Sequence, residues 1–339
     1  MPPSSPRLAI APMMRVTNRH FRELMRLLCD SNVELYTEMQ TSNFLLRGER
    51  SSVEAALRDE RNAKRTWLQI GGNDEFERVG RRVERYGYMG LNINVGCPSP
   101  RVSGAGQFGA SLMRRPERVG RLAADLAEGA RGRLPVSVKC RVGVVDEPNQ
   151  VVQRHDTTGE REEYERLAEF VETVHRVSGE VVTRFDVHAR CAVLRFDTKQ
   201  NRRVPPIKYD YVYRLCQDFP HLSFALNGQV SGFDDATNHV ERAPALDAIM
   251  IGRAARDRPA DLAPTSDVRT VAAAYAAYAA SELVESPGTN PRTLLAPLIN
   301  LVRGQSGARE FRRAMSDGKI TGTLDTHVTR ALEGVSWGC

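Results

Sequence analysis

Short runs of apolar and β-branched residues recur along the chain up to residue 251, and segments with a different periodicity separate them. The segments between the runs place apolar residues at helical spacing, as after Pro116, where Val119, Leu122 and Leu126 share one face. Runs that alternate with helices in this way are typical of βα units. Eight such units predict a closed (β/α)8 TIM barrel rather than an open doubly wound sheet. The predicted strands lie at 8–12, 33–38, 66–70, 91–95, 135–140, 184–188, 222–226 and 247–251.

The strand pattern stops at Ile251, and the rest of the chain has helical periodicity. Pro and Gly turns separate the helices that we expect there, at 268–285, 292–303, 307–316 and 324–334. We therefore divide the chain into a barrel at 1–262 and a small all-α C-terminal domain at 263–339. Within the barrel, residues 144–161 are polar and irregular, and we expect them to form an exposed loop over the C-terminal face.

Composition narrows the class of protein without naming an activity. The chain is 41% hydrophobic and 27% charged, and no apolar run approaches the roughly 18 to 20 residues of a membrane span. Its six cysteines include no C-x-x-C pair, so we expect neither a metal site nor a disulfide framework. A reducing compartment fits best, the cytoplasm first and an organelle as the alternative. The net charge of +6 is compatible with nucleic-acid binding but is also common among ordinary enzymes.

The predicted strands end in polar residues, and in a parallel barrel these ends build the active site. Glycines after strands seven and eight would let backbone N–H groups approach a cofactor phosphate. A cation such as Lys139 would stabilise an anionic reduced flavin ring at the barrel mouth. A single strand-end Lys or His is more often an ion-pair partner, so the prediction depends on several ends converging. The residues concerned are Gln69, Asn94, Lys139, His188, Asn227, Gly228, Gly252 and Arg253.

Cys97 lies in a Gly-Cys-Pro sequence directly after the fourth strand and before a flexible stretch at 99–109. It is either a buried packing residue or a thiol on a mobile loop. A nucleophile would want a basic neighbour, whereas an acid would want its thiol kept protonated by apolar surroundings. Arg101 is the only basic residue nearby in the sequence, so the acid role is preferred.

Several motifs together resemble the tRNA-dihydrouridine synthases, most closely their bacterial A-type branch. The most specific is NINVGCPSP at 92–100, and the resemblance spans the barrel and continues into the helical domain at 307–313. The other matching segments are 11–13, 36–39, 68–72, 108–113, 135–143, 188–190, 201–209, 218–222 and 252–253.

The resemblance implies an FMN enzyme that takes hydride from NADPH and reduces the C5=C6 bond of a uridine in tRNA, in the D-loop at position 20 or 20a. It implies that Cys97 protonates C5. The barrel would be the FMN-binding catalytic domain and the helical domain would bind tRNA; a monomer is favoured. The implied FMN contacts are Pro12, Met13, Met14, Gln69, Lys139, His188, Asn227, Gly228, Gln229, Gly252 and Arg253. Asn94, Lys199 and Arg202 match tRNA-contacting positions, and we add the basic residues Arg309, Arg312 and Arg313.

The chain departs from the family pattern at three places that bear on function. Gln229 stands where a second glycine is usual and could crowd the FMN phosphate unless only its backbone is used. Cys191 stands where a lysine is usual in the H-A-R-K-A motif, which removes a cation from the tRNA side of the site. Residues 294–297 (LLAP) replace a basic segment of the helical domain, which weakens the usual grip on tRNA.

Two other functions remain open at this point. One is an FMN barrel reductase that acts on a free pyrimidine, against which the helical domain and its basic residues argue. The other is a catalytically weakened homologue that binds tRNA without reducing it, which the changes at Gln229 and Cys191 would permit.

Overall fold

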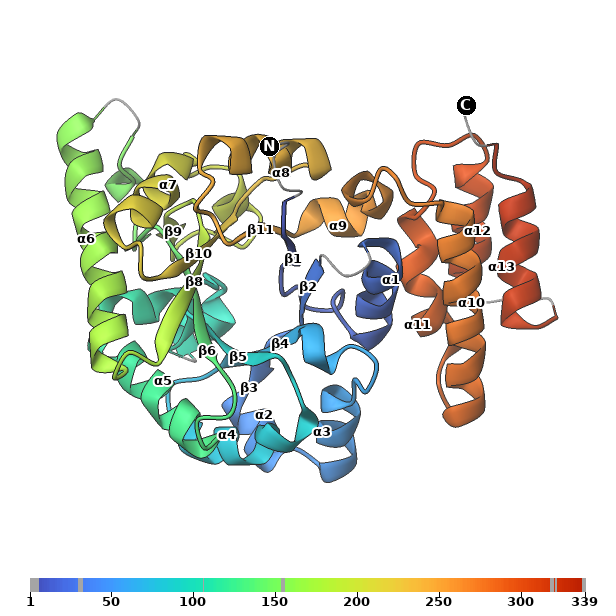
Figure 1. Cartoon of the computed structure of the whole chain (residues 1–339), viewed down its shortest axis with the longest axis horizontal. Coiled ribbons are helices and arrows are strands. Elements are labelled where there is room, and N and C mark those ends of the chain that lie inside the picture. Colours follow the sequence, from blue (N-terminus) through green and yellow to red (C-terminus); the bar gives the residue numbers. More distant parts are fainter. Residues whose placement is uncertain are drawn as a thin grey trace.

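A computed structural model describes residues 6–29, 33–105, 107–153, 156–317, 320 and 322–336, and its centre is a closed parallel barrel (Figure 1). Each of the eight strands pairs in parallel with its neighbours, and the pairing of the second with the third closes the ring. The predicted (β/α)8 fold is confirmed. The barrel strands are β1 (Leu8–Ile10), β2 (Val33–Tyr36), β4 (Thr66–Gly71), β5 (Gly90–Asn94), β6 (Val136–Arg141), β8 (Val182–His188), β10 (Ser223–Asn227) and β11 (Ala248–Ile251).

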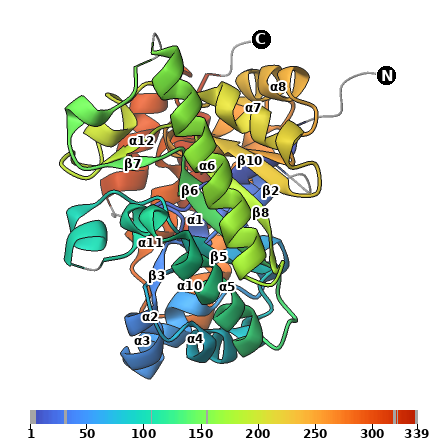
Figure 2. The same cartoon turned by 90° about the vertical axis from the view of Figure 1, so that its left-hand side faces the viewer.

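Helices surround the barrel and follow the strands as βα units require. Figure 2 shows α6 running across the outside of the sheet, with α5 beside it. These helices are α1 (Arg19–Cys29), α2 (Ser42–Arg47), α3 (Arg50–Leu57), α4 (Phe76–Val83), α5 (Pro116–Gly129), α6 (Thr157–Val177), α7 (Tyr209–Asp218), α8 (Phe233–Arg242) and α9 (Arg253–Asp257). Three short strands lie outside the ring: β3 (Gln40–Thr41), β7 (Val144–Val145) and β9 (Ala192–Val193).

The prediction of one irregular loop at 144–161 is wrong at both ends. Residues 144–145 form β7, which pairs with β9, and a 3-10 turn follows at Pro148–Gln150. Helix α6 already begins at Thr157, because the Asp156 side chain accepts a hydrogen bond from the Gly159 N–H and caps the helix. Residues 154 and 155 lie outside the described part of the chain.

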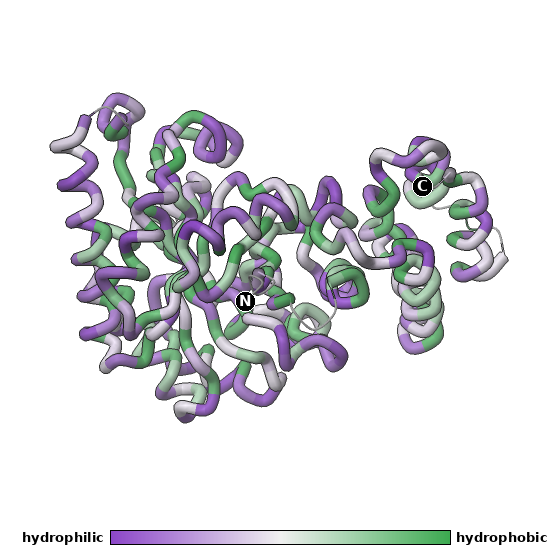
Figure 3. The backbone as a smooth tube through the Cα atoms, turned by 45° about the horizontal axis from the view of Figure 1, so that its top comes forward, coloured by the Kyte–Doolittle hydropathy of each residue, from purple (hydrophilic) through white to green (hydrophobic). Residues whose placement is uncertain are grey.

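The barrel separates two regions of packing with different chemistry. The larger apolar core lies between the strands and the surrounding helices, and in Figure 3 hydrophobic and hydrophilic residues alternate along those helices. Inside the ring, by contrast, the apolar cluster is small and consists largely of alanines with Tyr36, Trp67 and Met250. Polar side chains share that interior, among them the fully buried Asn92 and Asp186. The inner layer is therefore built for hydrogen bonding as well as packing.

The remaining helices form a separate group at one end of the molecule, and α10 packs against α1 of the barrel (Figure 1). The predicted helix at 292–303 is interrupted, because Pro297 has no backbone N–H and the chain continues as a 3-10 helix at Ala296–Asn300. The other three predicted helices of this region are confirmed to within a residue at each end. They are α10 (Val268–Glu285), α12 (Ala308–Asp317) and α13 (Leu324–Glu333), and α11 (Pro291–Leu295) is the first part of the interrupted helix.

Among the described residues, no helix is long and apolar enough to cross a membrane. The same residues contain no group of three or more histidine, cysteine or acidic side chains arranged to hold a metal ion.

Candidate active site

The carboxyl ends of β4, β5, β6 and β10 bring predicted residues from four strands into contact. Lys139 Nζ donates a hydrogen bond of 3.0 Å to Asn227 Oδ1 across the barrel mouth. Asn94 Nδ2 donates one of 2.9 Å to Gln69 Oε1 on the neighbouring strand. Parallel register explains the second contact, because Gln69 lies beside Asn92, two residues before Asn94 on the same face of β5. The convergence that the sequence predicted is therefore present for these four side chains.

Lys139 is a cation held in partly buried surroundings. Burial lowers its pKa to about 8, and the nearby charge of Asp186 opposes that shift. Its partner Asn227 has a fixed orientation, since Asn227 Nδ2 donates to the backbone oxygen of Met250 at 2.8 Å. The amide oxygen of Asn227 therefore faces Lys139. Lys139 is mostly protonated at neutral pH and lies where it can face the electron-rich edge of a bound ring.

His188 lies at the end of β8, beside the glycine turn that follows β10. Burial, together with the cations Arg141, Lys139, Arg190 and Arg253, lowers its pKa well below the ordinary value. A neutral imidazole keeps one N–H for donation and one nitrogen for acceptance. His188 can thus hydrogen-bond a cofactor without adding another positive charge.

The backbone turn at Gly228 and Gln229 lies close to His188, and a side chain at position 228 would not fit there. Gly228 has φ +128°, and a Cβ there would lie 3.0 Å from Cδ2 of His188. Gln229 has φ +58° in the left-handed region, where glycine is usual. Its side chain accepts a hydrogen bond of 2.5 Å from Arg190, so it is held by a protein partner and its backbone N–H is what the turn offers. This arrangement fits a phosphate held by backbone groups.

The remaining predicted cofactor residues differ in their surroundings. Met13 is half-buried, and a Cβ added at Gly252 would lie 3.7 Å from its sulfur, so the ends of β1 and β11 meet there. Pro12 is also half-buried. Met14 is 61% exposed and Arg253 is exposed, so any contact that they make with a ligand lies at the rim of the mouth.

The backbone around Cys97 is held by several hydrogen bonds. Asn94 Oδ1 accepts from the N–H of Gly96 at 3.2 Å and from that of Cys97 at 3.0 Å. The carbonyl oxygen of Cys97 accepts from the Ala110 N–H at 2.9 Å and from the Ser103 hydroxyl at 2.7 Å. Cys97 itself is half-buried. The loop therefore presents the thiol from a fixed backbone position.

The electrostatic surroundings of Cys97 differ from those inferred from the sequence. Arg141, Lys139 and Arg202 act on the thiol although they are distant in the chain, so a prediction based on Arg101, the only basic residue near Cys97 in the sequence, missed them. These cations and a hydrogen bond from the Ser99 backbone favour the thiolate. Burial outweighs them and raises the pKa of the thiol above its usual value. Cys97 is thus protonated at neutral pH, which suits an acid.

Arg141 is a buried residue of the site whose role the sequence did not reveal. Its guanidinium donates to the backbone oxygens of Gly96 at 3.0 Å, Cys191 at 3.3 Å and Asn201 at 3.1 Å. It therefore joins the loops after β5 and β8 and the segment before α7. The sequence did carry a sign that Arg141 belongs to the site. Ser137, Lys139 and Arg141 occupy alternate positions of one strand, which places all three on the inner face.

The predicted tRNA-contacting residues lie in two separate places. Asn94 and the half-buried Arg202 are near the mouth, and the pKa of Arg202 is lowered by burial and by Arg253 and Arg256. Lys199 is exposed just before the 3-10 turn at Gln200–Arg202. The other three, Arg309, Arg312 and Arg313, are exposed on α12 of the helical domain.

The two other departures from the family pattern are mostly buried, with Ala296 as the exposed residue of the 294–297 segment. Cys191 is 2% exposed, and its carbonyl oxygen is one of the acceptors of Arg141. Leu294 and Leu295 are fully buried in the helical domain, where the Tyr275 hydroxyl donates to the Leu294 oxygen at 2.6 Å. Neither leucine can therefore contact tRNA.

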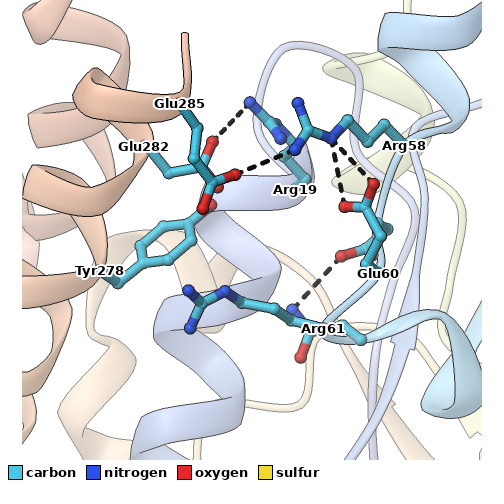
Figure 4. A pocket seen from close by; sticks show the side chains of 9 residues that line it. Arg19, Arg58, Glu60, Arg61, Tyr278, Glu282 and Glu285 are labelled. Carbon is cyan, nitrogen blue, oxygen red and sulfur yellow. Dashed lines mark hydrogen bonds and ion pairs between the residues drawn. The ribbon is translucent and has the colours of Figure 1, made fainter.

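A polar cavity of about 350 Å³ lies away from this mouth, between α10 and the segment that precedes β4 (Figure 4). Arg19 pairs with Glu282 at 2.5 Å, and Arg58 pairs with Glu285 at 3.0 Å, so each ion pair joins the barrel to α10. The Arg61 guanidinium lies 5.2 Å from the ring centre of Tyr278 on the same helix. None of the predicted site residues lines the cavity. We interpret the cavity as part of the contact between the barrel and the C-terminal helices.

Two solved structures resemble the chain weakly. A variant of NCR from Zymomonas mobilis has a TM-score of 0.44 at 14% identity and covers 75% of this chain and 83% of its own. A 2-naphthoyl-CoA reductase complex with 2-naphthoyl-CoA has a TM-score of 0.49 at 9% identity and covers 75% of this chain and 49% of its own.

The sequence comparisons are much stronger. A protein of Xanthomonas axonopodis pv. citri (strain 306) named tRNA-dihydrouridine(20/20a) synthase is 36% identical, covering 93% of this chain and 89% of its own. Proteins of the same name from Escherichia coli (strain K12) and from Synechocystis sp. (strain ATCC 27184 / PCC 6803 / Kazusa) are each 34% identical; they cover 96% and 92% of this chain, and 90% and 89% of their own. The family model described as Dihydrouridine synthase (Dus) matches residues 9–318. This chain, with its thiol at the mouth of a parallel barrel, therefore belongs to the dihydrouridine synthase family.

Proposed function

We propose that this protein is a flavin-dependent tRNA-dihydrouridine synthase that reduces the C5=C6 bond of a uridine in tRNA. The observation that carries the proposal is the Cys97 thiol, presented by a hydrogen-bonded backbone at a barrel mouth lined by Lys139 and His188, in a chain of the dihydrouridine synthase family. The relatives' name supports position 20 or 20a of the D-loop as the target. We further propose FMN as the flavin, NADPH as the electron donor and the cytoplasm as the compartment.

The mouth offers groups of the kinds that FMN requires. Lys139 would face the pyrimidine edge of the ring, and Gln69 and His188 would hydrogen-bond its polar atoms. The Gly228 turn leaves backbone N–H groups open to a phosphate, with Gly252 and Arg253 on the adjacent strand end. Pro12, Met13, Met14, Asn227 and Gln229 complete the proposed set. Bound FMN would supply hydride for C6 of the uracil.

Cys97 would supply the other hydrogen. Its S–H bond breaks as a C–H bond forms at C5, so hydride at C6 and a proton at C5 together saturate the double bond. The electron pair comes from the donor NADPH, and the thiolate left on Cys97 regains its proton from solvent. The cations Arg141, Lys139 and Arg202 would stabilise that thiolate transiently.

The uridine must leave its base stack to reach a mouth of this depth. We assign residues 1–262 to catalysis and 263–339 to tRNA binding, with Asn94, Lys199 and Arg202 contacting the nucleotide near the mouth. The exposed arginines of α12 would bind tRNA phosphates that lie away from the reacting uridine. The two parts are joined by the ion pairs of Figure 4, which would fix the spacing between the two contact regions.

The purified protein is expected to be yellow, with absorbance near 450 nm, about where oxidised flavins absorb, and one FMN per chain. NADPH should bleach this band, and unmodified tRNA should restore it while mass spectrometry of the nucleosides finds dihydrouridine. Free uracil serves as the control and should not restore the band. Protein that carries reducible FMN but forms no dihydrouridine would contradict the proposed function.

Removing the basic residues of α12 should weaken tRNA binding in a salt-dependent way. Each phosphate contact releases counterions, so Arg312→Ala and Arg313→Ala should each flatten the slope of log affinity against log salt by about 0.7 to 0.9. Fluorescence titration at several salt concentrations measures the slope. Arg81→Ala, an exposed arginine on α4, is the matched control and should leave it unchanged. Unchanged affinity in both α12 variants would show that this face does not bind tRNA.

A further inference from the structure

A chain of side-chain amides links the Cys97 loop to a carboxylate inside the barrel. Asn94 Oδ1 accepts from the Cys97 N–H at 3.0 Å, and Asn94 Nδ2 donates to Gln69 Oε1 at 2.9 Å. Gln69 Nε2 donates to Asn92 Oδ1 at 2.7 Å, and Asn92 Nδ2 donates to Asp186 Oδ2 at 3.1 Å. Every amide donates in the same direction, toward Asp186. All four side chains are at least nine-tenths buried.

The direction of this chain is set by its two ends. An amide has an oxygen side and an NH2 side of nearly equal shape, so each of the three amides could be rotated by half a turn without a steric penalty. At one end, a backbone N–H can only donate. At the other end, an ionised carboxylate can only accept. With those ends, only one orientation of Asn92, Gln69 and Asn94 makes all the hydrogen bonds that join the amides to each other and to the two ends. The Ser137 hydroxyl accepts from Asn92 Nδ2 at 2.8 Å, but a hydroxyl can equally donate to an amide oxygen, so it does not set the orientation.

Asp186 also accepts hydrogen bonds from donors outside the row of amides. Arg184 Nε donates to Asp186 Oδ1 at 3.2 Å, and the Tyr36 hydroxyl donates to Asp186 Oδ2 at 2.8 Å. Arg184 also pairs with Glu34 at 2.7 Å and with Asp247 at 2.7 Å, so a network of charges surrounds it. The carboxylate is fully buried.

We propose that Asp186 and Asn92 are positioning residues for the Cys97 acid: the carboxylate fixes the orientation of three amides, and the last of them holds the backbone that presents the thiol. This inference rests on the proposed function for its catalytic meaning, but its structural content can be measured without flavin or tRNA. Asp186 touches no reacting atom; because its charge also acts on Lys139, hydrogen exchange at the Cys97 loop, and not the reaction rate, is the readout specific to the amides.

The substitution Asp186→Asn should reverse the orientation of all three side-chain amides, Asn92, Gln69 and Asn94. Arg184 cannot accept a hydrogen bond, so the oxygen of the new side chain must face Arg184 and its NH2 must face Asn92. Asn92 must then rotate, and Gln69 and Asn94 must follow. The last rotation turns the Asn94 NH2 toward the Cys97 N–H, which places two donors together. The N–H groups of Gly96 and Cys97 should therefore lose their acceptor, although the substitution lies three side chains away.

Hydrogen exchange of the Gly96 and Cys97 amides in the flavin-free protein tests this directly. Asp186→Asn should accelerate exchange at these two amides by about tenfold or more, because a hydrogen bond is replaced by an unfavourable contact. Glu34→Gln is the matched control, since it removes a buried carboxylate of the same charge network outside the amide chain. The Glu34→Gln variant should have lower thermal stability but no selective acceleration of hydrogen exchange at Gly96 and Cys97.

A second variant tests whether the direction of the amide hydrogen bonds is what holds the Cys97 loop. Adding Asn94→Asp to Asp186→Asn moves the carboxylate to the other end, so the amides can all point the opposite way and the Cys97 N–H again meets an acceptor. The double variant should regain slow exchange at Gly96 and Cys97. A purely structural role for Asp186 predicts no such recovery. If Asp186→Asn does not fold, Asn92→Ala cuts the same chain and should show the same local acceleration.

The outcomes separate this inference from the proposed function. Acceleration at Gly96 and Cys97 with recovery in the double variant supports the positioning role even if the protein fails to reduce tRNA. Unchanged exchange at those amides, or an equal increase in Glu34→Gln, would overturn it even if the wild-type protein is an active synthase. In the flavin-loaded Asp186→Asn protein, the maximal rate of reoxidation by tRNA should fall, whereas the salt slope of tRNA binding should not change.

Discussion

Alanine at Cys97 is expected to leave reduction of the bound flavin by NADPH nearly unchanged and to slow its reoxidation by tRNA by on the order of 10² to 10⁴. The first half of the reaction does not use the thiol. The second needs a proton at C5 as hydride reaches C6, and the raised pKa of Cys97 keeps that proton available at neutral pH. Stopped-flow absorbance of the flavin band follows both phases in one sample.

Two controls make this result specific to the acid role. Cys97→Ser should recover little of the rate, because a hydroxyl is a much weaker acid than a thiol. Cys216→Ala removes another buried cysteine, on the outer helix α7, and should leave both phases unchanged. If Cys97 only packs, its alanine variant should lower stability and slow both phases together. Equal losses in the two phases would remove Cys97 from the mechanism.

Methionine at Lys139 is expected to slow reduction of the flavin by NADPH by on the order of 10², because it removes the preorganised cation from the site where negative charge develops. The barrel should stay folded, since methionine has similar length and the position is only half-buried. Lys64→Met, an exposed lysine in the turn before β4, is the matched control and should leave the rate unchanged. A similar loss in thermal stability and in rate for Lys139→Met would point to a structural role instead.

The pH dependence provides a second measurement on the same residue. Burial lowers the pKa of Lys139 to about 8 in the flavin-free protein, and a bound anionic ring raises it. Lys139 is charged below its pKa and neutral above it, so the rate of flavin reduction should fall as the pH rises through about 8 or somewhat higher. The Lys139→Met variant should lack this alkaline fall, because it has no proton to lose. An identical fall in both proteins would assign the titration to another group.

The fold could be predicted because its strands carry their own signal. Residues such as Leu68 and Ile70 lie in short apolar runs at regular spacing, and eight such runs leave few arrangements open. The first residues of helix α6 were assigned to the predicted loop at 144–161, since the capping residue Asp156 lies within a polar segment. The break at Pro297 was readable from the sequence, but apolar periodicity on both sides of it favoured one continuous helix.

The site was predictable residue by residue but not as a network. Arg184, Asp186 and His188 alternate with Phe185 and Val187, which indicates a polar inner face. The hydrogen bond from Asn92 to Asp186 nevertheless joins positions 94 residues apart, and no local pattern gives that pairing. The surroundings of Cys97 were misjudged for the same reason, because Arg141 reaches its loop from the next strand.

The clamp formed by Arg141 has a consequence for engineering this enzyme. One guanidinium supplies hydrogen bonds to carbonyl oxygens at Gly96, Cys191 and Asn201, so three loops share a single donor. A loop transplanted alone from a relative, to change which uridine is modified, would have to present its carbonyl to Arg141 at the same point or leave a buried N–H without a partner. The three segments should therefore be exchanged between relatives as one unit. A change of the target uridine should succeed when all three are replaced together rather than singly.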